Sequence, residues 1–338
     1  MFRRVMIVPF SIGRRVACRV SIHVALLCLI ALLLVTHSAS AETWAEKLGF
    51  PAGRRVLILH SDDIGMCYEA NQAAKHYLNE GEIQSAALMV PCPWFNEMAD
   101  WYKQHPDHDI GLHLTLTSEW KFYRWGPVAP RDQVPGLIDD EGYLWREVVP
   151  VVLRSSPKEV EAEIRAQIER ALERGIRPSH IDTHMGTLYA SPGFTEAYLR
   201  VAEEYRIPAM AIEPTPSMAA KFRKKGYPVS DRFFELLANY SLPKLDDFDA
   251  VPAGKTYEEK VKKFFEQIRL LEPGITELIF HPSVDTEGLH HITNSWQQRV
   301  WEARMFSDPQ VKQFLEREQI IFTNWKEMMA RFDARKEK

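Results

Sequence analysis

Cysteine is scarce in this sequence. Of its four cysteines, Cys18 and Cys28 lie within the first 41 residues, which leaves Cys67 and Cys92 for the remaining chain. Each of these two follows a different predicted strand and their spacing requires no bridge, so we expect free or buried thiols rather than a disulfide framework. Neither has the surroundings of a nucleophile. Short repeats, a Walker motif and a Gly-x-Gly-x-x-Gly segment after the first predicted strand are also missing, so the sequence carries no nucleotide-binding fingerprint.

An excess of positive charge is missing as well. The chain has 42 Lys and Arg residues against 46 Asp and Glu residues, and five of the arginines lie in residues 1–41, where there is no acid. Without those five positive charges the formal net charge falls from −4 to −9. Such a chain has no electrostatic footprint for nucleic acid or for an anionic membrane, so we expect neither as a partner. Neutral substrates or cationic products fit this charge better.

Residues 1–41 have the pattern of a secretory signal peptide. Five arginines precede an apolar run at 22–35, which has no Asp, Glu, Lys or Arg. Ala39 and Ala41 then occupy the −3 and −1 positions of a cleavage site. The run is shorter than the roughly 20 residues of a membrane span, although an uncleaved anchor is the alternative. We expect cleavage after Ala41, a periplasmic or secreted protein without membrane contact, and a single domain over 42–338.

Apolar runs and amphipathic helical patterns alternate after residue 54. Segments 55–60 and 109–116 are typical of buried strands, whereas 156–176 predicts a helix with Ser156 as its amino-terminal cap. This alternation indicates a parallel sheet with helices outside it. We predict an α/β fold, a distorted (β/α) barrel with its active site at the carboxyl ends of the strands, and an open doubly wound sheet as the alternative. Residues 214–255 are too irregular for their strands to be counted.

Aspartate or histidine side chains stand where four of the predicted strands end. They are Asp62 and Asp63 in "HSDDIG", His113 in "DIGLHLTL", His184 in "SHIDTH" and His281 in "ELIFHP". Because the carboxyl ends of parallel strands share one face, we expect these side chains to converge. Neighbouring strand residues point to opposite sides, so both aspartates can reach the site only where their strand breaks into a loop, as Gly65 suggests.

A mixed set of histidine and carboxylate ligands is typical of a catalytic metal site. Two neutral imidazoles and one carboxylate hold a divalent ion and leave positions open for water and substrate. A second acid beside the liganding one can take a proton from water, and a histidine across the site can protonate a leaving amine. The paired aspartates are then explained as one ligand and one base.

Each motif also has a structural interpretation. The Asp62-Asp63 pair could be a turn or a helix cap, His113 could be a core histidine, and His281 could merely end its strand. It is their joint occurrence that favours a shared site.

Three tryptophans and a charged pair leave further alternatives open. Trp120, Trp125 and Trp145, in a long insertion at about 118–156, could stack on sugar rings or could pin the loop to the barrel. Arg299 and Glu302 have the spacing of an i, i+3 ion pair on a helix.

The motifs "HSDDIG", "IGLHLTL", "RPSHIDTH" and "FHP", in this order and spacing, resemble those of the YdjC-like (ChbG/HpnK) carbohydrate deacetylases. The resemblance covers roughly residues 54–325 and includes "QVPGLIDDEGYLW" in the insertion. It implies a distorted (β/α) barrel that hydrolyses N-acetyl groups on amino sugars with one divalent metal ion, Mg²⁺ or Zn²⁺. Transferred to this chain, it implies Asp63, His113 and His184 as metal ligands, Asp62 as general base and His281 as general acid.

The sequence departs from the family pattern at a few positions. Met185, Gly186 and Thr187 follow where the family usually has further histidines, and Ser61 and Ile64 replace its usual Ala and Phe. Most relatives are cytoplasmic, whereas this chain carries an export pattern.

The expected function is therefore a periplasmic or secreted metal-dependent hydrolase that removes N-acetyl groups from amino sugars or oligosaccharides. A non-catalytic carbohydrate-binding barrel is the first alternative. A metal phosphoesterase ranks below it, since few basic residues stand near the motifs to hold a phosphate. The sequence gives no indication of the oligomeric state.

Overall fold

The computed structural model describes residues 42–224, 226 and 229–336; residues 1–41, where the signal peptide is predicted, lie outside the described part. The chain divides into two units, residues 1–42 and 43–338, and the described helices and strands all belong to the second. Among the described helices, none is long and apolar enough to cross a membrane.

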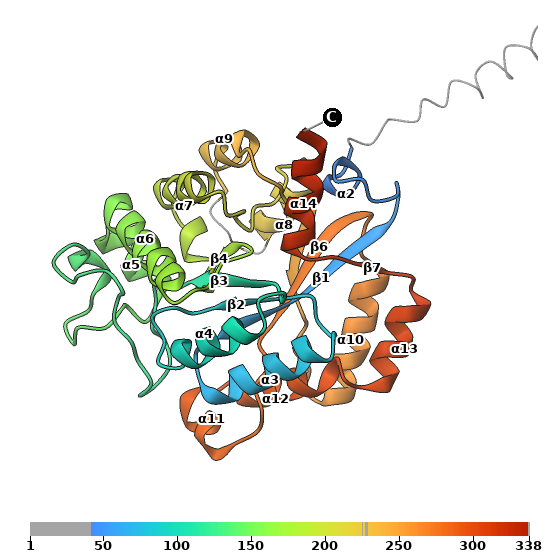
Figure 1. Cartoon of the computed structure of the whole chain (residues 1–338), viewed down its shortest axis with the longest axis horizontal. Coiled ribbons are helices and arrows are strands. Elements are labelled where there is room, and N and C mark those ends of the chain that lie inside the picture. Colours follow the sequence, from blue (N-terminus) through green and yellow to red (C-terminus); the bar gives the residue numbers. More distant parts are fainter. Residues whose placement is uncertain (1–41, 225, 227–228, 337–338) are drawn as a thin grey trace, which may run out of the picture. The chain divides into compact units, whose positions relative to one another are not determined.

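Six parallel strands form a curled sheet in the order β4-β3-β2-β1-β6-β5, and a short seventh strand, β7, pairs with the amino-terminal part of β1 (Figure 1). The strands are β1 (Arg55–Ile64), β2 (Ser85–Leu88), β3 (Ile110–Leu114), β4 (Ile181–Thr183), β5 (Asp247–Ala250), β6 (Gly274–Phe280) and β7 (Ile321–Phe322). The sheet forms a half-barrel, which confirms the predicted α/β class and the barrel curvature.

The gap between β4 and β5 is crossed by residues 208–213. Ile181 donates its N–H to the Pro208 carbonyl and accepts from the N–H of Met210, whereas Leu245 makes the equivalent pair of bonds with Ala211 and Glu213. These are isolated bridges rather than a regular strand. They nevertheless carry the curvature of the sheet from β4 toward β5.

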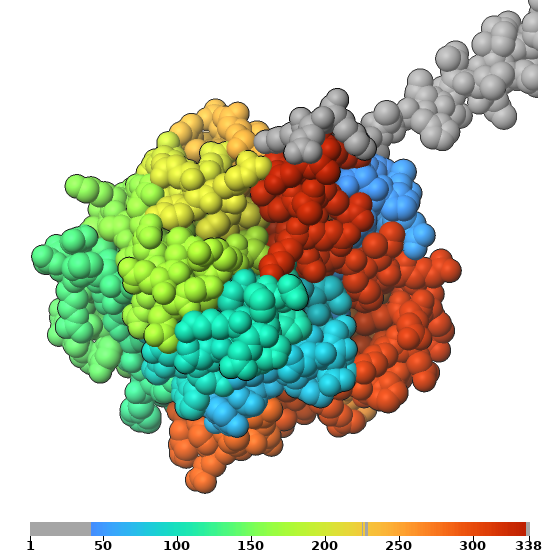
Figure 2. All heavy atoms as spheres, viewed as in Figure 1, coloured from blue at the N-terminus to red at the C-terminus, as the bar shows by residue number. Residues whose placement is uncertain are grey.

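Helices cover the outside of the sheet. They are α2 (Trp44–Lys47), α3 (Tyr68–Asn79), α4 (Phe95–Gln104), α5 (Val148–Arg154), α6 (Pro157–Glu173), α7 (Pro192–Tyr205), α8 (Pro216–Lys224), α9 (Asp231–Asn239), α10 (Tyr257–Arg269), α11 (Glu287–Ile292), α12 (Trp296–Met305), α13 (Pro309–Arg317) and α14 (Trp325–Lys336), with 3₁₀ turns η1 (Pro135–Leu137) and η2 (His184–Tyr189). On the face shown in Figure 2, the red atoms of the carboxyl-terminal segment lie between the yellow and green atoms of the middle of the chain and the blue atoms of the segment near residue 50.

Local sequence explains the clearest elements. Leu57, Ile58 and Leu59 of β1 are buried on both sides of the sheet, as expected for a strand in a covered parallel sheet. Helix α6 begins with the predicted cap: the Ser156 hydroxyl accepts the N–H of Glu159, and the Glu159 carboxylate accepts the N–H of Ser156. The irregular stretch at 214–255 contains α8, α9 and β5.

Candidate metal centre and active-site cavity

The five predicted site residues come together at the carboxyl ends of the strands. Asp62 and Asp63 lie at the end of β1, His113 lies in β3, His184 directly follows β4, and His281 directly follows β6. All five line one cavity of about 420 Å³. The sheet topology therefore joins residues that are more than 200 positions apart in the sequence.

Asp62 and Asp63 both face the site because the backbone turns between them. Asp63 has a φ of 62°, in the left-handed region, and the register of β1 against β2 shifts between Ser61 and Ile64. Asp is among the residues that tolerate this conformation best. The strand therefore breaks at Asp63 itself, two residues before the expected Gly65.

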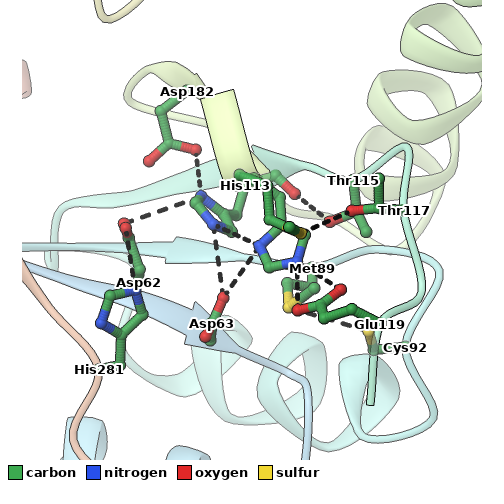
Figure 3. Close-up of polar contacts among 12 residues, drawn as sticks. Asp62, Asp63, Met89, Cys92, His113, Thr115, Thr117, Glu119, Asp182 and His281 are labelled. Carbon is green, nitrogen blue, oxygen red and sulfur yellow. Dashed lines mark hydrogen bonds and ion pairs between the residues drawn. The ribbon is translucent and has the colours of Figure 1, made fainter. Parts of the chain in front are cut away.

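Three atoms in the cavity form a compact triangle. The distance from Asp63 Oδ1 is 3.4 Å to His113 Nε2 and 3.3 Å to His184 Nδ1, and the two nitrogens are 3.2 Å apart (Figure 3). Ligands held about 2.0–2.2 Å from a tetrahedral ion stand roughly 3.3–3.6 Å from one another. Asp63 Oδ1 is also buried without a hydrogen-bond partner. The donor types, the spacing and the unpaired oxygen all fit a divalent metal ion.

Each histidine of the triangle is held from behind by a carboxylate. His113 Nδ1–H donates to Asp182 Oδ1 at 2.7 Å, because the register of β3 on β4 places these two residues opposite each other. His184 Nε2–H donates to Glu119, whose oxygens are 2.9 and 3.1 Å away. These bonds fix the tautomers so that His113 Nε2 and His184 Nδ1 offer lone pairs to an ion. Glu119 follows no recognised motif, and sequence reasoning missed it.

The electrostatics of the triangle favour a positive charge within it. Burial opposes protonation of His184, but Glu119 and then Asp63 outweigh it and raise the pKa of His184 to about 10. Burial likewise opposes a charge on His113, whose pKa is raised by Asp182 and Asp62. Because a metal ion binds neutral imidazole, ion binding here displaces protons from these histidines.

Arg299 and Glu302 do not form the predicted ion pair. Arg299 Nη2 donates to Asp63 Oδ2 at 2.6 Å, whereas Glu302 accepts the backbone N–H of His281 and the Lys260 ammonium at 2.7 and 2.8 Å. All of these acids and cations are largely buried, and tertiary packing overrides the helical spacing. Burial alone would raise the pKa of Asp63, but Arg299, followed by nearby histidines, holds it well below its usual value.

Asp62 and His281 lie beside the triangle. Asp62 Oδ2 is 3.7 Å from His281 Nε2, and Asp62 Oδ1 is 3.7 Å from His113 Nδ1 (Figure 3). Asp62 is 4% exposed, whereas the His281 side chain is 34% exposed. One is thus a sheltered carboxylate and the other an accessible imidazole, both on the wall of the same cavity.

The three tryptophans of the insertion differ in their positions. Trp120 lines the cavity and packs on His184, with ring centroids 5.7 Å apart. Trp125 and Trp145 instead donate their indole N–H groups to the backbone carbonyls of Thr117 and Gly136, so they pin the loop.

The two cysteines are free and buried, as predicted. Burial raises the pKa of Cys67 to about 12 and the pKa of Cys92 well above its usual value, so both remain protonated thiols.

Comparison with known proteins places these features in context. Residues 56–317 match the family model described as YdjC-like protein. A carbohydrate deacetylase from Thermus thermophilus is 31% identical over 271 residues, 80% of this chain and 92% of the relative; one from Brevibacillus brevis is 35% identical over 152 residues, 45% and 57% of the two chains. A solved structure from Enterococcus faecalis, whose description mentions cellobiose-phosphate cleavage, is 23% identical and superposes with a TM-score of 0.68 over 82% of this chain and 99% of that one.

Proposed function

The chain belongs to the YdjC-like protein family, and from this membership we propose that it is a metal-dependent deacetylase that removes N-acetyl groups from amino sugars or their oligosaccharides. Relatives at 24–35% identity are named carbohydrate deacetylases. The observation that carries the proposal is the triangle of Asp63, His113 and His184 with Asp62 and His281 at its side in one cavity.

Asp63, His113 and His184 would hold the ion, with Glu119 and Asp182 orienting the two imidazoles. When bound, a divalent ion supplies polarisation of the acetamide carbonyl and lowers the pKa of water. Arg299 holds the other oxygen of Asp63, which keeps Oδ1 directed at the histidines.

Two residues accept and donate the protons of the hydrolysis. Asp62 accepts a proton from the attacking water while that water's oxygen bonds to the acetyl carbon. As the C–N bond breaks, His281 donates a proton to the departing nitrogen, which leaves a free amine and acetate. The two side chains are 3.7 Å apart, so both can reach one acetamide group. The exposure of His281 suits a contact with the leaving sugar.

The remaining cavity wall suits a neutral sugar. Met185, Tyr189, Phe222 and Phe248 line it together with Trp120, which provides apolar faces for sugar rings. Among the described lining residues, Arg299 is the one Lys or Arg, and Asp63 occupies its Nη2 group. A phosphate group therefore has little to bind, which ranks the phosphoesterase last.

Release of acetate tests the proposal directly. The purified protein, loaded in turn with Mg²⁺ and Zn²⁺, is incubated with N-acetylated chitooligosaccharides and, separately, with phosphosugars. We expect acetate from the first and no phosphate from the second, and chelation abolishes activity. Sugar binding without acetate release would instead support the non-catalytic alternative, and phosphate release would support the phosphoesterase.

We also propose export to the periplasm or the medium. This proposal rests on the pattern of residues 1–41 alone.

A further inference from the structure

A buried imidazole lies behind the active site, between two of its carboxylates. His60, in β1, is fully buried, and its Nε2 is 3.2 Å from Asp62 Oδ1 and 3.2 Å from Asp182 Oδ2. Its Nδ1 faces Glu277, whose Oε2 is 3.9 Å away. Neither of the Nε2 contacts is aligned as a single hydrogen bond, which fits one donor shared between two acceptors.

We propose that His60 is a positioning residue that joins the general base, Asp62, to Asp182, the carboxylate that orients His113. This inference rests on the proposed function. His60 does not reach the cavity, so it acts through these two acids and does not touch the substrate.

His60 faces one oxygen of each of the two aspartates. Asp182 uses Oδ1 for His113 and turns Oδ2 toward His60. Asp62 turns Oδ1 toward His60, which leaves Oδ2 on the side of His281. A single N–H at Nε2 thus holds both carboxylates in one rotamer. It also leaves Oδ2 as the oxygen of Asp62 that can accept a proton.

The local charge also requires a donor at this position. Asp62, Asp182 and Glu277 surround His60, and each is at most 4% exposed. Buried carboxylates without a compensating partner are costly. Burial opposes a charge on His60, but Glu277, Asp182 and Asp62 together raise its pKa well above the usual value.

His180 offers a matched control. It is also fully buried, lies next to His60 with ring centroids 5.0 Å apart, and stacks on Trp325. Its Nδ1 lies 2.9 Å from the Ser179 hydroxyl and 3.6 Å from Asp109 Oδ1, so this nitrogen faces Ser179 and Asp109 instead of Asp62.

The test compares three variants of the metal-loaded protein. His60→Phe removes the donor, His60→Gln retains an N–H donor, and His180→Gln perturbs the neighbouring imidazole. We expect His60→Phe to lower kcat about 10–100-fold with little change in KM, the range typical for loss of an outer-shell partner. His60→Gln should recover most of this loss, and His180→Gln should keep near-normal kcat. Unchanged kcat in His60→Phe, or no recovery in His60→Gln, would overturn the proposal.

Two measurements keep the inference testable if a variant does not fold or if the protein releases no acetate. Side-chain ¹⁵N NMR of the wild-type protein should show a proton on His60 Nε2 at pH 8; an unprotonated Nε2 refutes the shared donor. Elemental analysis should find one ion per chain. His60, His180 and Asp182 also lie close enough together to hold an ion, so two ions per wild-type chain and one in His60→Gln would make His60 a ligand instead.

Discussion

Glu119 provides the sharpest test of the metal centre, because it was absent from the set of motif residues. Its carboxylate accepts a hydrogen bond from His184 Nε2 with both oxygens within 3.1 Å. This bond keeps the proton on Nε2 and leaves Nδ1 free to bind an ion. Glu119→Ala removes the acceptor, so the ring can rotate and the proton can move to Nδ1. Glu119→Gln keeps an acceptor oxygen but removes the charge.

The expected loss of metal affinity follows from the role of Glu119, which does not touch the ion but holds one of its ligands, His184. Loss of such a group typically lowers metal affinity about 10–100-fold, which is about 1.4–2.7 kcal/mol. The Glu119 side chain is 22% exposed, so water can partly replace it after truncation. We therefore expect about tenfold weaker binding in Glu119→Gln and a loss nearer 100-fold in Glu119→Ala.

Calorimetric titration of the metal-free protein with Zn²⁺ measures these affinities. Glu141→Gln is the control, because Glu141 lies in the same insertion, is 71% exposed and pairs only loosely with Arg124, at 3.5 Å. It should bind zinc like the wild type. If Glu119→Ala also binds zinc with wild-type affinity, His184 does not ligate through Nδ1 and the triangle is not the metal site.

Three further predictions concern the acids and the amino terminus. Asp62→Asn should retain the ion and lose about 10²–10⁴-fold in kcat, as for loss of a general base. Asp63→Asn should instead lose the ion. Near-normal turnover of metal-loaded Asp62→Asn would mean that another residue is the base. Burial raises the pKa of Glu163 from 4.5 to about 7, so the native state holds a proton that the unfolded state has released between these values. Its contribution to the free energy of unfolding therefore falls by up to about 3 kcal/mol as the pH rises from 4.5 to 7. In urea titrations, the free energy of unfolding of Glu163→Gln should depend less on pH over this range than that of the wild type. An equal pH dependence in the two proteins would contradict the raised pKa of Glu163. The exported protein should begin at Glu42, and mass spectrometry that finds residues 1–41 on it would contradict cleavage after Ala41.

The sequence alone was sufficient for the elements with local signals. The apolar run of β1, the Ser156 cap of α6 and the alternation of strands with helices depend on neighbouring residues, so they can be read without the fold. The convergence of Asp63, His113 and His184 also follows from the sequence, because parallel strands have their carboxyl ends on one face whatever their order.

Only the tertiary structure decided which side chains support that centre. Glu119 lies in an insertion without periodicity, and its contact with His184 has no local signature in the sequence. Arg299 pairs with Asp63 and not with Glu302 on its own helix, so this contact has no local signature either. The pairing of His113 with Asp182 depends on the register of β3 against β4, which sequence spacing does not specify. His60 is set between Asp62 and Asp182 by that same packing. These contacts join segments more than 60 residues apart or depend on the curvature of the sheet, so they exist only once the long-range packing has formed.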